Sequence, residues 1–179
     1  MADIPLAPGS LVALSPAALH RLRDSAGAQA LQEAGYAAGD DLYRAFTSWL
    51  PSVASVDDPA DLAAERLPEI VSRFFSSIGW GGVSVSQLAA STVAVDSADW
   101  AEAQPGVGLQ YPSCAFTSGV LADFFSLLGS APLATMEVEC RSRGDARCRW
   151  LLGAPESLTT LYEHMAQGAD YLTVLGGAA

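Results

Sequence analysis

The stretch that decides the fold runs from residue 111 to residue 152, YPSCAFTSGVLADFFSLLGSAPLATMEVECRSRGDARCRWLL. Residues 114–129 are apolar on nearly every side when wound into a helix, a pattern typical of a helix buried on most of its faces. Residues 133–140 and 148–152 predict two antiparallel strands, joined by a turn at Gly144-Asp145. The stretch therefore indicates a buried helix followed by an antiparallel hairpin.

The flanking segments predict further helices and a second hairpin. Apolar residues recur at helical spacing from Pro16 to about Gly27, from Ala30 to Gly35, from Leu42 to Trp49, from Pro59 to Ile78 and from Pro155 to Met165. Pro68 should kink one of these helices or mark a restart, because its ring removes a hydrogen-bond donor. Residues 83–88 and 92–95 predict two more strands. The sequence thus predicts an α+β fold, with an antiparallel sheet packed against several helices.

Gly35 and Gly39 lie four residues apart between two of the helical segments. They mark either the end of one helix and the start of the next, or a place where two helices approach closely.

The composition limits the class of function. The chain has 179 residues, half of them hydrophobic and 16% charged, which is enough for one domain over residues 1–179. Its net charge is −11, which disfavours binding to nucleic acids and to anionic membranes. The sequence shows neither a secretory signal pattern nor an apolar run of about 18 residues. We therefore expect a cytoplasmic protein without a membrane span, whose thiols stay reduced.

All three cysteines lie in the decisive stretch. Cys114 falls in the first turn of the buried helix, where free N–H groups and the helix dipole favour a thiolate. Cys140 and Cys148 lie on opposite arms of the hairpin and can converge across it. Three thiolates on two elements suit a zinc ion, with a fourth ligand completing the tetrahedron. The alternatives are buried unreactive thiols, or a disulfide between Cys140 and Cys148, which a reducing compartment disfavours.

The fourth ligand stays open at this point. His20 and His164 lie in helical segments far from the cysteines in sequence. Three carboxylates are closer: Glu137, Glu139 and Asp145. Strand alternation places the first two on the face opposite Cys140 unless a bulge intervenes. Periodicity alone therefore does not select the ligand.

The decisive stretch resembles a known family. Residues 111–129, YPSCAFTSGVLADFFSLLG, followed by residues 136–152, MEVECRSRGDARCRWLL, are similar to the core of the four-vinyl-reductase (vinyl-4-reductase) domain. Residues 18–42, ALHRLRDSAGAQALQEAGYAAGDDL, resemble the helical start of that family, with its Gly-Tyr-x-x-Gly pattern. The resemblance extends from about Ala17 to the last helix and implies a domain core at about residues 17–168. The family takes its name from a bacteriochlorophyll-pathway protein and includes sensory domains of phenol- and toluene-responsive activators.

The resemblance implies a set of metal ligands. In the aromatic-sensing members, three cysteines and one glutamate hold a zinc ion. That spacing falls here on Cys114, Glu137, Cys140 and Cys148, with the Glu-x-x-Cys-x7-Cys pattern intact. Four protein ligands leave no open coordination position, so the zinc is expected to be structural and not catalytic.

The resemblance also implies a fold and a state of assembly. The family is similar to subunits of the TRAPP vesicle-tethering complex and to ligand-binding domains of nitric-oxide signalling proteins. The TRAPP-like domains dimerise through helices, so we expect a homodimer, for which the small residues at Gly35 and Gly39 are suited.

Three functions follow from the sequence and the resemblance. The first is a stand-alone sensory or binding domain for a small hydrophobic or aromatic ligand. The second is a dimeric scaffold resembling the tethering subunits. The third is an accessory factor in tetrapyrrole vinyl reduction, but Gly106-Val107-Gly108 does not fit a dinucleotide fingerprint and an enzyme is not favoured. Aromatic residues that could line a ligand pocket, each also suited to a core, are Phe74, Phe75, Trp100, Phe116, Phe124 and Trp150.

Overall fold

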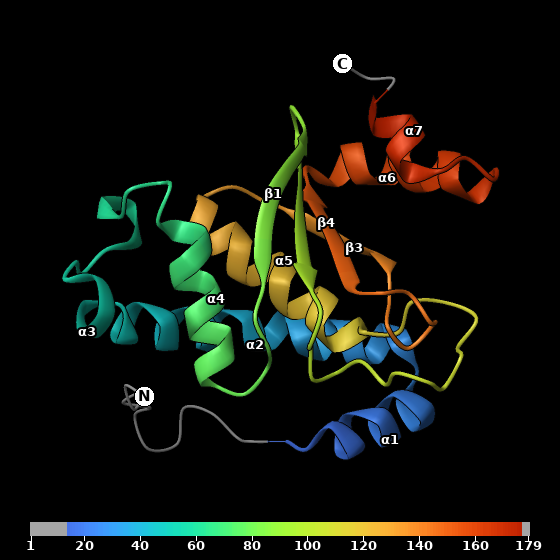
Figure 1. Cartoon of the computed structure of the whole chain (residues 1–179), viewed down its shortest axis with the longest axis horizontal. Coiled ribbons are helices and arrows are strands. Elements are labelled where there is room, and N and C mark those ends of the chain that lie inside the picture. Colours follow the sequence, from blue (N-terminus) through green and yellow to red (C-terminus); the bar gives the residue numbers. More distant parts are fainter. Residues whose placement is uncertain (1–13, 177–179) are drawn as a thin grey trace.

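The computed structural model describes residues 14–176 and places them in an α+β fold (Figure 1). The strands are β1 Ser84–Ala89, β2 Thr92–Ser97, β3 Ala134–Glu139 and β4 Cys148–Gly153. The helices are α1 Pro16–Ala26, α2 Ala28–Trp49, α3 Pro51–Ala54, α4 Leu67–Ser77, α5 Ala115–Gly129, α6 Pro155–Ala166 and α7 Tyr171–Gly176, and a 3-10 turn spans Pro59–Asp61. The strands form one antiparallel sheet in the order β1-β2-β4-β3. The predicted fold class is confirmed.

Both faces of the sheet are covered, and side chains that alternate along β4 contribute to the core on each face. Trp150 and Leu152 belong to the larger core, which the sheet shares with α2, α4 and α5. Leu151 points to the other face and joins a smaller core with Leu158 and Leu161 of α6. Every residue of β4 is buried as a result, which explains its run of large apolar side chains.

The helix α5 is packed against α2 at very short distance. The middle of α5 is fully buried, as its all-round apolar pattern predicts. A Cβ atom on Gly119 would lie 2.0 Å from the carbonyl oxygen of Gln32, and one on Gly35 would lie 2.0 Å from that of Phe116. The two backbones therefore approach more closely than any other residue type would allow at these positions.

The helix α2 is continuous through both of its central glycines. Of the two interpretations of Gly35 and Gly39, close approach is the one the structure adopts. A Cβ atom on Gly39 would lie 2.5 Å from the Cβ atom of Asp123 in α5, so the second glycine serves the same contact. The small residues that suit a helix-mediated homodimer are thus used inside one chain, and the homodimer itself stays a prediction.

The segment predicted as one helix from Pro59 to Ile78 is divided in two. The 3-10 turn opens it, and α4 begins only at Leu67, with Pro68 in its first turn. Pro68 marks a restart and not a kink, because an N–H in the first turn of a helix has no intrahelical partner to lose. None of the helices between residues 14 and 176 combines the length and hydrophobicity that a membrane span requires.

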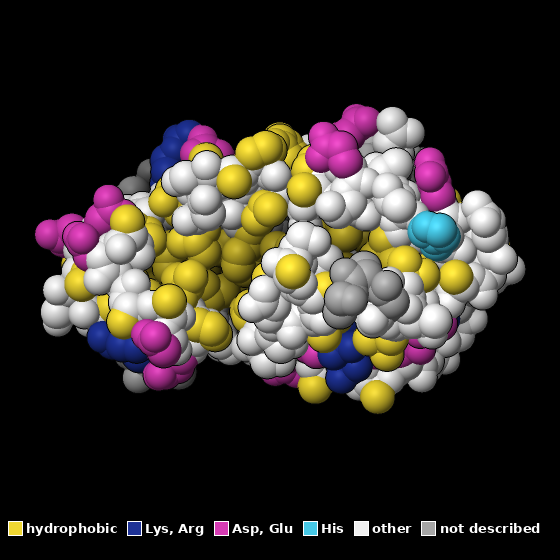
Figure 2. All heavy atoms as spheres, turned by 90° about the horizontal axis from the view of Figure 1, so that it is seen from above, with side chains coloured by type: hydrophobic (Ala, Val, Ile, Leu, Met, Phe, Trp, Pro, Cys, Tyr) yellow, Lys and Arg dark blue, Asp and Glu magenta, His cyan; other side chains and the backbone are white. Residues whose placement is uncertain are grey.

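One face of the molecule carries an apolar hollow. Seen from above the view of Figure 1, hydrophobic side chains gather in a depression on the side of α4, and charged side chains lie around it (Figure 2). A gathering of this kind marks a surface suited to contact with an apolar partner.

We expect Gly119→Ala to lower the free energy of unfolding by about 3 kcal/mol or more, because the added Cβ atom would overlap backbone atoms of α2 that cannot rotate away. Gly129→Ala in the same helix is the matched control. Its Cβ atom would meet nothing within 4 Å, so we expect no loss and a gain of at most about 1 kcal/mol. Urea denaturation of both variants gives the comparison; equal stability would mean that α2 and α5 are less tightly packed than described.

Candidate metal centre and adjoining cavity

Three buried thiols converge where α5 meets the β3–β4 hairpin. The Sγ atoms of Cys114 and Cys140 lie 3.8 Å apart, and those of Cys114 and Cys148 lie 3.9 Å apart. Two sulfurs bound to one zinc ion at about 2.3 Å lie about 3.8 Å apart in tetrahedral geometry, whereas a disulfide needs about 2.05 Å. The spacing of these free cysteines therefore fits a metal cage and not a disulfide.

Glu137 completes the cluster. One of its carboxylate oxygens and the three Sγ atoms all lie within 4.8 Å of one another. Its Oε2 accepts a hydrogen bond from the backbone N–H of Cys114 at 2.8 Å, whereas its Oε1 is buried with no hydrogen-bond partner. A buried carboxylate oxygen without a partner is costly and needs an explanation. A cation between the three sulfurs and this oxygen would be the missing partner of Oε1, so the cluster could hold a metal ion.

A bulge in β3 brings Glu137 to the cluster. Glu137 pairs with Trp150 and Glu139 pairs with Arg149, so two steps along β3 match a single step along β4. The bulge turns Glu137 to the face that carries Cys148 and turns Glu139 to the opposite face. Simple alternation placed both glutamates together and away from the cysteines, and the bulge is the feature it could not include.

The turn after β3 holds Cys140 in place. The N–H of Arg143 donates to the carbonyl oxygen of Cys140 at 2.9 Å, and the carboxylate of Asp145 accepts from the N–H of Cys140 at 2.7 Å. Gly144 adopts a φ of 110°, which allows the chain to return toward Cys148. Asp145, considered from sequence as a ligand, serves this turn instead.

The cluster favours a positive charge. Burial raises the pKa of Glu137 to about 9, and charge on the neighbouring Cys140 sulfur adds to the rise. Contacts with the other two thiols, followed by burial, raise the pKa of Cys114 above its ordinary range. Four acidic groups in one buried place cannot all ionise without a cation. A divalent ion would reverse these shifts, because it favours the ionised form of each ligand.

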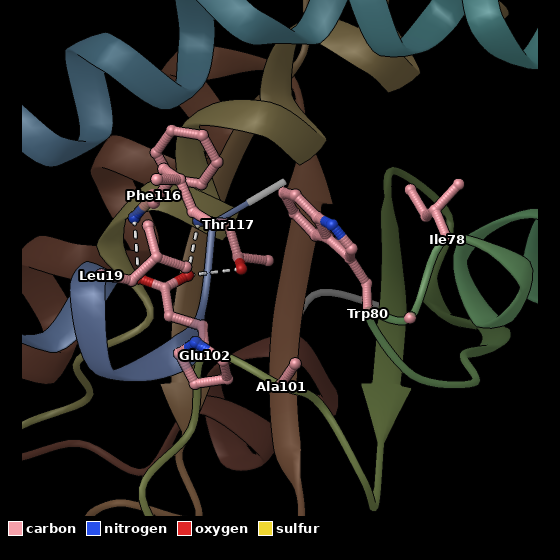
Figure 3. A pocket seen from close by; sticks show the side chains of 10 residues that line it. Leu19, Ile78, Trp80, Ala101, Glu102, Phe116 and Thr117 are labelled. Carbon is pink, nitrogen blue, oxygen red and sulfur yellow. Dashed lines mark hydrogen bonds between the residues drawn. The ribbon is translucent and has the colours of Figure 1, made fainter. Parts of the chain in front are cut away.

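A cavity of about 170 Å³ lies on the other side of the first turn of α5 (Figure 3). It is formed by the start of α1, the turn before β1, the segment around Glu102 and the start of α5. Its lining residues are Leu14, Pro16, Leu19, Ile78, Gly79, Trp80, Ala101, Glu102, Phe116 and Thr117. Figure 3 shows Glu102, Phe116 and Thr117 together on one side, with Trp80 and Ile78 on the other.

Glu102 is the charged residue of this lining set, and only 5% of it is exposed. Its carboxylate accepts from the N–H of Phe116 at 3.1 Å and from the N–H of Thr117 at 2.8 Å. It also accepts from the Thr117 hydroxyl at 2.5 Å, and that hydroxyl accepts from the indole N–H of Trp100 at 2.6 Å. Burial raises the pKa of Glu102, although these hydrogen bonds oppose the rise. The sequence does not point to Glu102 as a site residue, because a long loop separates it from the helix it caps.

The aromatic residues proposed for a pocket divide into two groups. Phe116 lines the cavity. The other five form part of the aromatic core and are at most 1% exposed: Phe74, Phe75, Trp100, Phe124 and Trp150. Trp80, which the sequence did not single out, adds a second ring to the cavity wall. Its indole ring lies 5.9 Å from the ring of Phe116.

Residues 99–154 match the family model of the vinyl-4-reductase domain. The matched segment begins just before Glu102 and extends through β4, so it contains all four residues of the metal cluster. The resemblance to the four-vinyl-reductase family is thereby confirmed for this part of the chain. No curated protein matches the sequence.

Solved structures extend the likeness beyond the matched segment. The crystal structure of the phenol-responsive sensory domain of the transcription activator PoxR with phenol is similar with a TM-score of 0.58, 16% identity and coverage of 82% of this chain and 77% of that one. A trafficking protein particle complex subunit 3 from Naegleria fowleri, covalently bound to palmitic acid, is similar with a TM-score of 0.56 and 13% identity; the likeness covers 76% of this chain and 87% of that one. A vinyl-4-reductase family protein from Methanocaldococcus jannaschii has a TM-score of 0.46 and 17% identity, over 68% of this chain and 66% of that one. The first two likenesses establish the expected fold.

We expect Glu137→Gln to weaken metal binding by at least about tenfold, because the amide has no charge, and the loss of mere outer-shell partners already costs about 10–100-fold. Glu139→Gln is the matched control: its carboxylate lies two residues away on the opposite face, paired with Arg147 at 3.0 Å. Metal content per chain is measured by native mass spectrometry after purification without added metal. Equal retention by both variants would remove Glu137 from the ligand set.

Proposed function

We propose that this chain is a small-molecule-binding domain of the sensory type, in which a structural zinc ion supports a cavity for a small hydrophobic ligand. Cys114, Glu137, Cys140 and Cys148 would hold the zinc. The proposal rests on the shared position of the metal cluster and the cavity. The metal cluster and the cavity meet at the first turn of α5, through Cys114 on one side and through Phe116 and Thr117 on the other.

Zinc is the metal that this ligand set favours. Thiolates select soft or borderline ions, zinc also accepts a carboxylate oxygen, and four protein ligands make a closed site of the structural kind. When bound, the ion would supply no chemistry beyond a cross-link, because its four positions are taken by protein. It would tie the β3–β4 hairpin to the start of α5 and contribute its binding free energy to folding.

The size and lining of the cavity support a ligand of one ring. A dry apolar cavity of about 150 Å³ is large enough to hold benzene, and this one measures about 170 Å³. Apart from Glu102 and Thr117, its lining side chains are apolar. Small-molecule sites commonly combine an apolar wall with a few polar groups that orient the ligand. The fold shared with the PoxR sensory domain is consistent with such a role.

The helix α1 is suited to respond to the ligand. It contributes Pro16 and Leu19 to the cavity wall, yet none of its residues is buried. The His20 ring nitrogen lies 2.9 Å from the carbonyl oxygen of Glu102 and ties α1 to the rest of the wall. Gly27, with a φ of 84°, joins α1 to α2. A ligand that contacts α1 would favour the position of this helix against the cavity, which is how a bound molecule shifts the population of conformations.

We expect Ala101→Leu to lower the affinity for a small apolar probe such as toluene by at least about tenfold, because the larger side chain would occupy space that the ligand needs. Ala98→Leu, at an exposed position in the same loop, is the matched control. Isothermal titration calorimetry on the metal-loaded protein gives both affinities. Unchanged binding in Ala101→Leu would place the ligand elsewhere, and no binding to the wild-type protein would count against the proposal as a whole.

A dimeric interaction module is the second candidate, and the apolar hollow of Figure 2 favours it. If that surface pairs two chains, the protein should run as a dimer by light scattering, and the dimer fraction should fall on dilution. A monomer across the whole concentration range would contradict the homodimer and this second candidate together.

A further inference from the structure

Glu102 is a buried acid without a cationic partner. The ion pairs within residues 14–176 do not include it, and its three hydrogen bonds come from neutral groups. A buried carboxylate is costly unless a positive charge or a metal compensates it. Arginine and histidine are missing from the lining set of the cavity. Within residues 14–176 the groups that contact the Glu102 carboxylate therefore supply no positive charge, and a ligand in the cavity is placed to supply one.

The Glu102 carboxylate also keeps one hydrogen-bond acceptor site open. An ionised carboxylate offers about four lone-pair sites. Its Oε2 accepts two hydrogen bonds, both from Thr117, and its Oε1 accepts one, from the N–H of Phe116. One acceptor site on Oε1 remains free. A ligand with a single strong donor would complete the shell of Glu102 without displacing the hydrogen bonds that cap α5.

The aromatic wall suits the same ligand. The rings of Trp80 and Phe116 lie 5.9 Å apart at an interplanar angle of 46°, and both line the cavity. Faces of aromatic rings attract cations, indole most strongly. An anionic ligand would instead meet the Glu102 carboxylate in a protein of net charge −11. The other lining side chains, such as Leu19 and Ile78, provide apolar contact for a ring.

We propose that the cavity selects a small cyclic amine in its protonated form, with the ammonium group donating to Glu102 Oε1 and the ring against Trp80 and Phe116. This inference rests on the proposed function, because it takes the cavity as the ligand site. Glu102 is then the residue that determines specificity. It contacts both the ligand and the first turn of α5, so the bound cation favours the ionised form of Glu102 that accepts from the N–H groups of Phe116 and Thr117.

The test compares four probes that share one ring and differ in the head group: benzylamine, benzyl alcohol, toluene and benzoate. Each is titrated into the metal-loaded wild-type protein by calorimetry at pH 7. We expect benzylamine to bind at least about tenfold more tightly than benzyl alcohol and toluene, because its ammonium group forms an ion pair with Glu102, whereas benzyl alcohol brings a neutral donor and toluene brings none. We expect no binding of benzoate. Toluene or benzyl alcohol binding as well as benzylamine would overturn the amine preference and leave the proposed function standing. Failure of all four probes to bind would overturn both.

A variant assigns the preference to Glu102. Glu102→Gln removes the charge and leaves one acceptor oxygen, which can serve Thr117 while the N–H of Phe116 loses its acceptor. The advantage of benzylamine over toluene should fall to about threefold or less, while toluene binding is unchanged. Should this variant fail to fold, Trp80→Leu at the partly exposed end of the cavity tests the same idea. It should weaken benzylamine binding several-fold more than toluene binding, since it removes the cation–π contact. An unchanged preference in folded Glu102→Gln would contradict the assignment to Glu102, and an unchanged preference in Trp80→Leu would contradict the placement of the ammonium ligand against Trp80.

Discussion

The first turn of α5 is the constraint on which the rest of the structure depends. The first N–H groups of a helix have no partner inside it and attract negative charge. Here a buried carboxylate and a partly buried one accept from them. Glu137 takes the N–H of Cys114, and Glu102 takes those of Phe116 and Thr117. A single helix end thus organises both the metal cluster and the wall of the cavity.

Each of these carboxylates carries a cost that the helix end alone does not remove. Burial raises the pKa of both groups, which shows that the charged form is disfavoured where they lie. For Glu137 the three sulfurs beside it define where a cation would sit. For Glu102 the neighbouring space is a cavity, so a cation would have to arrive with a ligand. In the proposed function, a bound metal ion compensates the charge on one side of α5, and a ligand that exchanges compensates it on the other.

The helix end can hold this role because α5 is fixed in position. Its glycine contact with α2 leaves no space for α5 to slide along α2. On the sheet side, the core contains Trp150 of β4 and Trp100 of the loop after β2, whose rings lie 5.4 Å apart. By contrast α1 contributes to the cavity without burying any of its own residues. The molecule therefore combines a buried central helix with a cavity wall formed in part by α1, which buries no residue and is joined to the Glu102 segment by the His20 hydrogen bond. Local stability commonly differs in this way between the core and a ligand-binding edge.

The sequence by itself determined the fold class and the convergence of the cysteines, because both follow from local patterns. The all-round apolar helix at 115–129 must be buried, and a hairpin turning at Gly144 must bring its two cysteines together. Glu137 came only from the resemblance, since strand parity pointed away from the cluster. The tertiary structure alone decided three things: the bulge that turns Glu137 inward, the use of Gly35 against α5 of the same chain, and the placement of Glu102 at a helix start across a long loop. A bulge changes which face of the strand a residue points to, and no local pattern in the sequence marks it. A glycine in a helix indicates that another segment packs closely there but does not identify that segment. A hydrogen bond between segments joined by an irregular loop depends on how the whole core packs, so no period in the sequence records it.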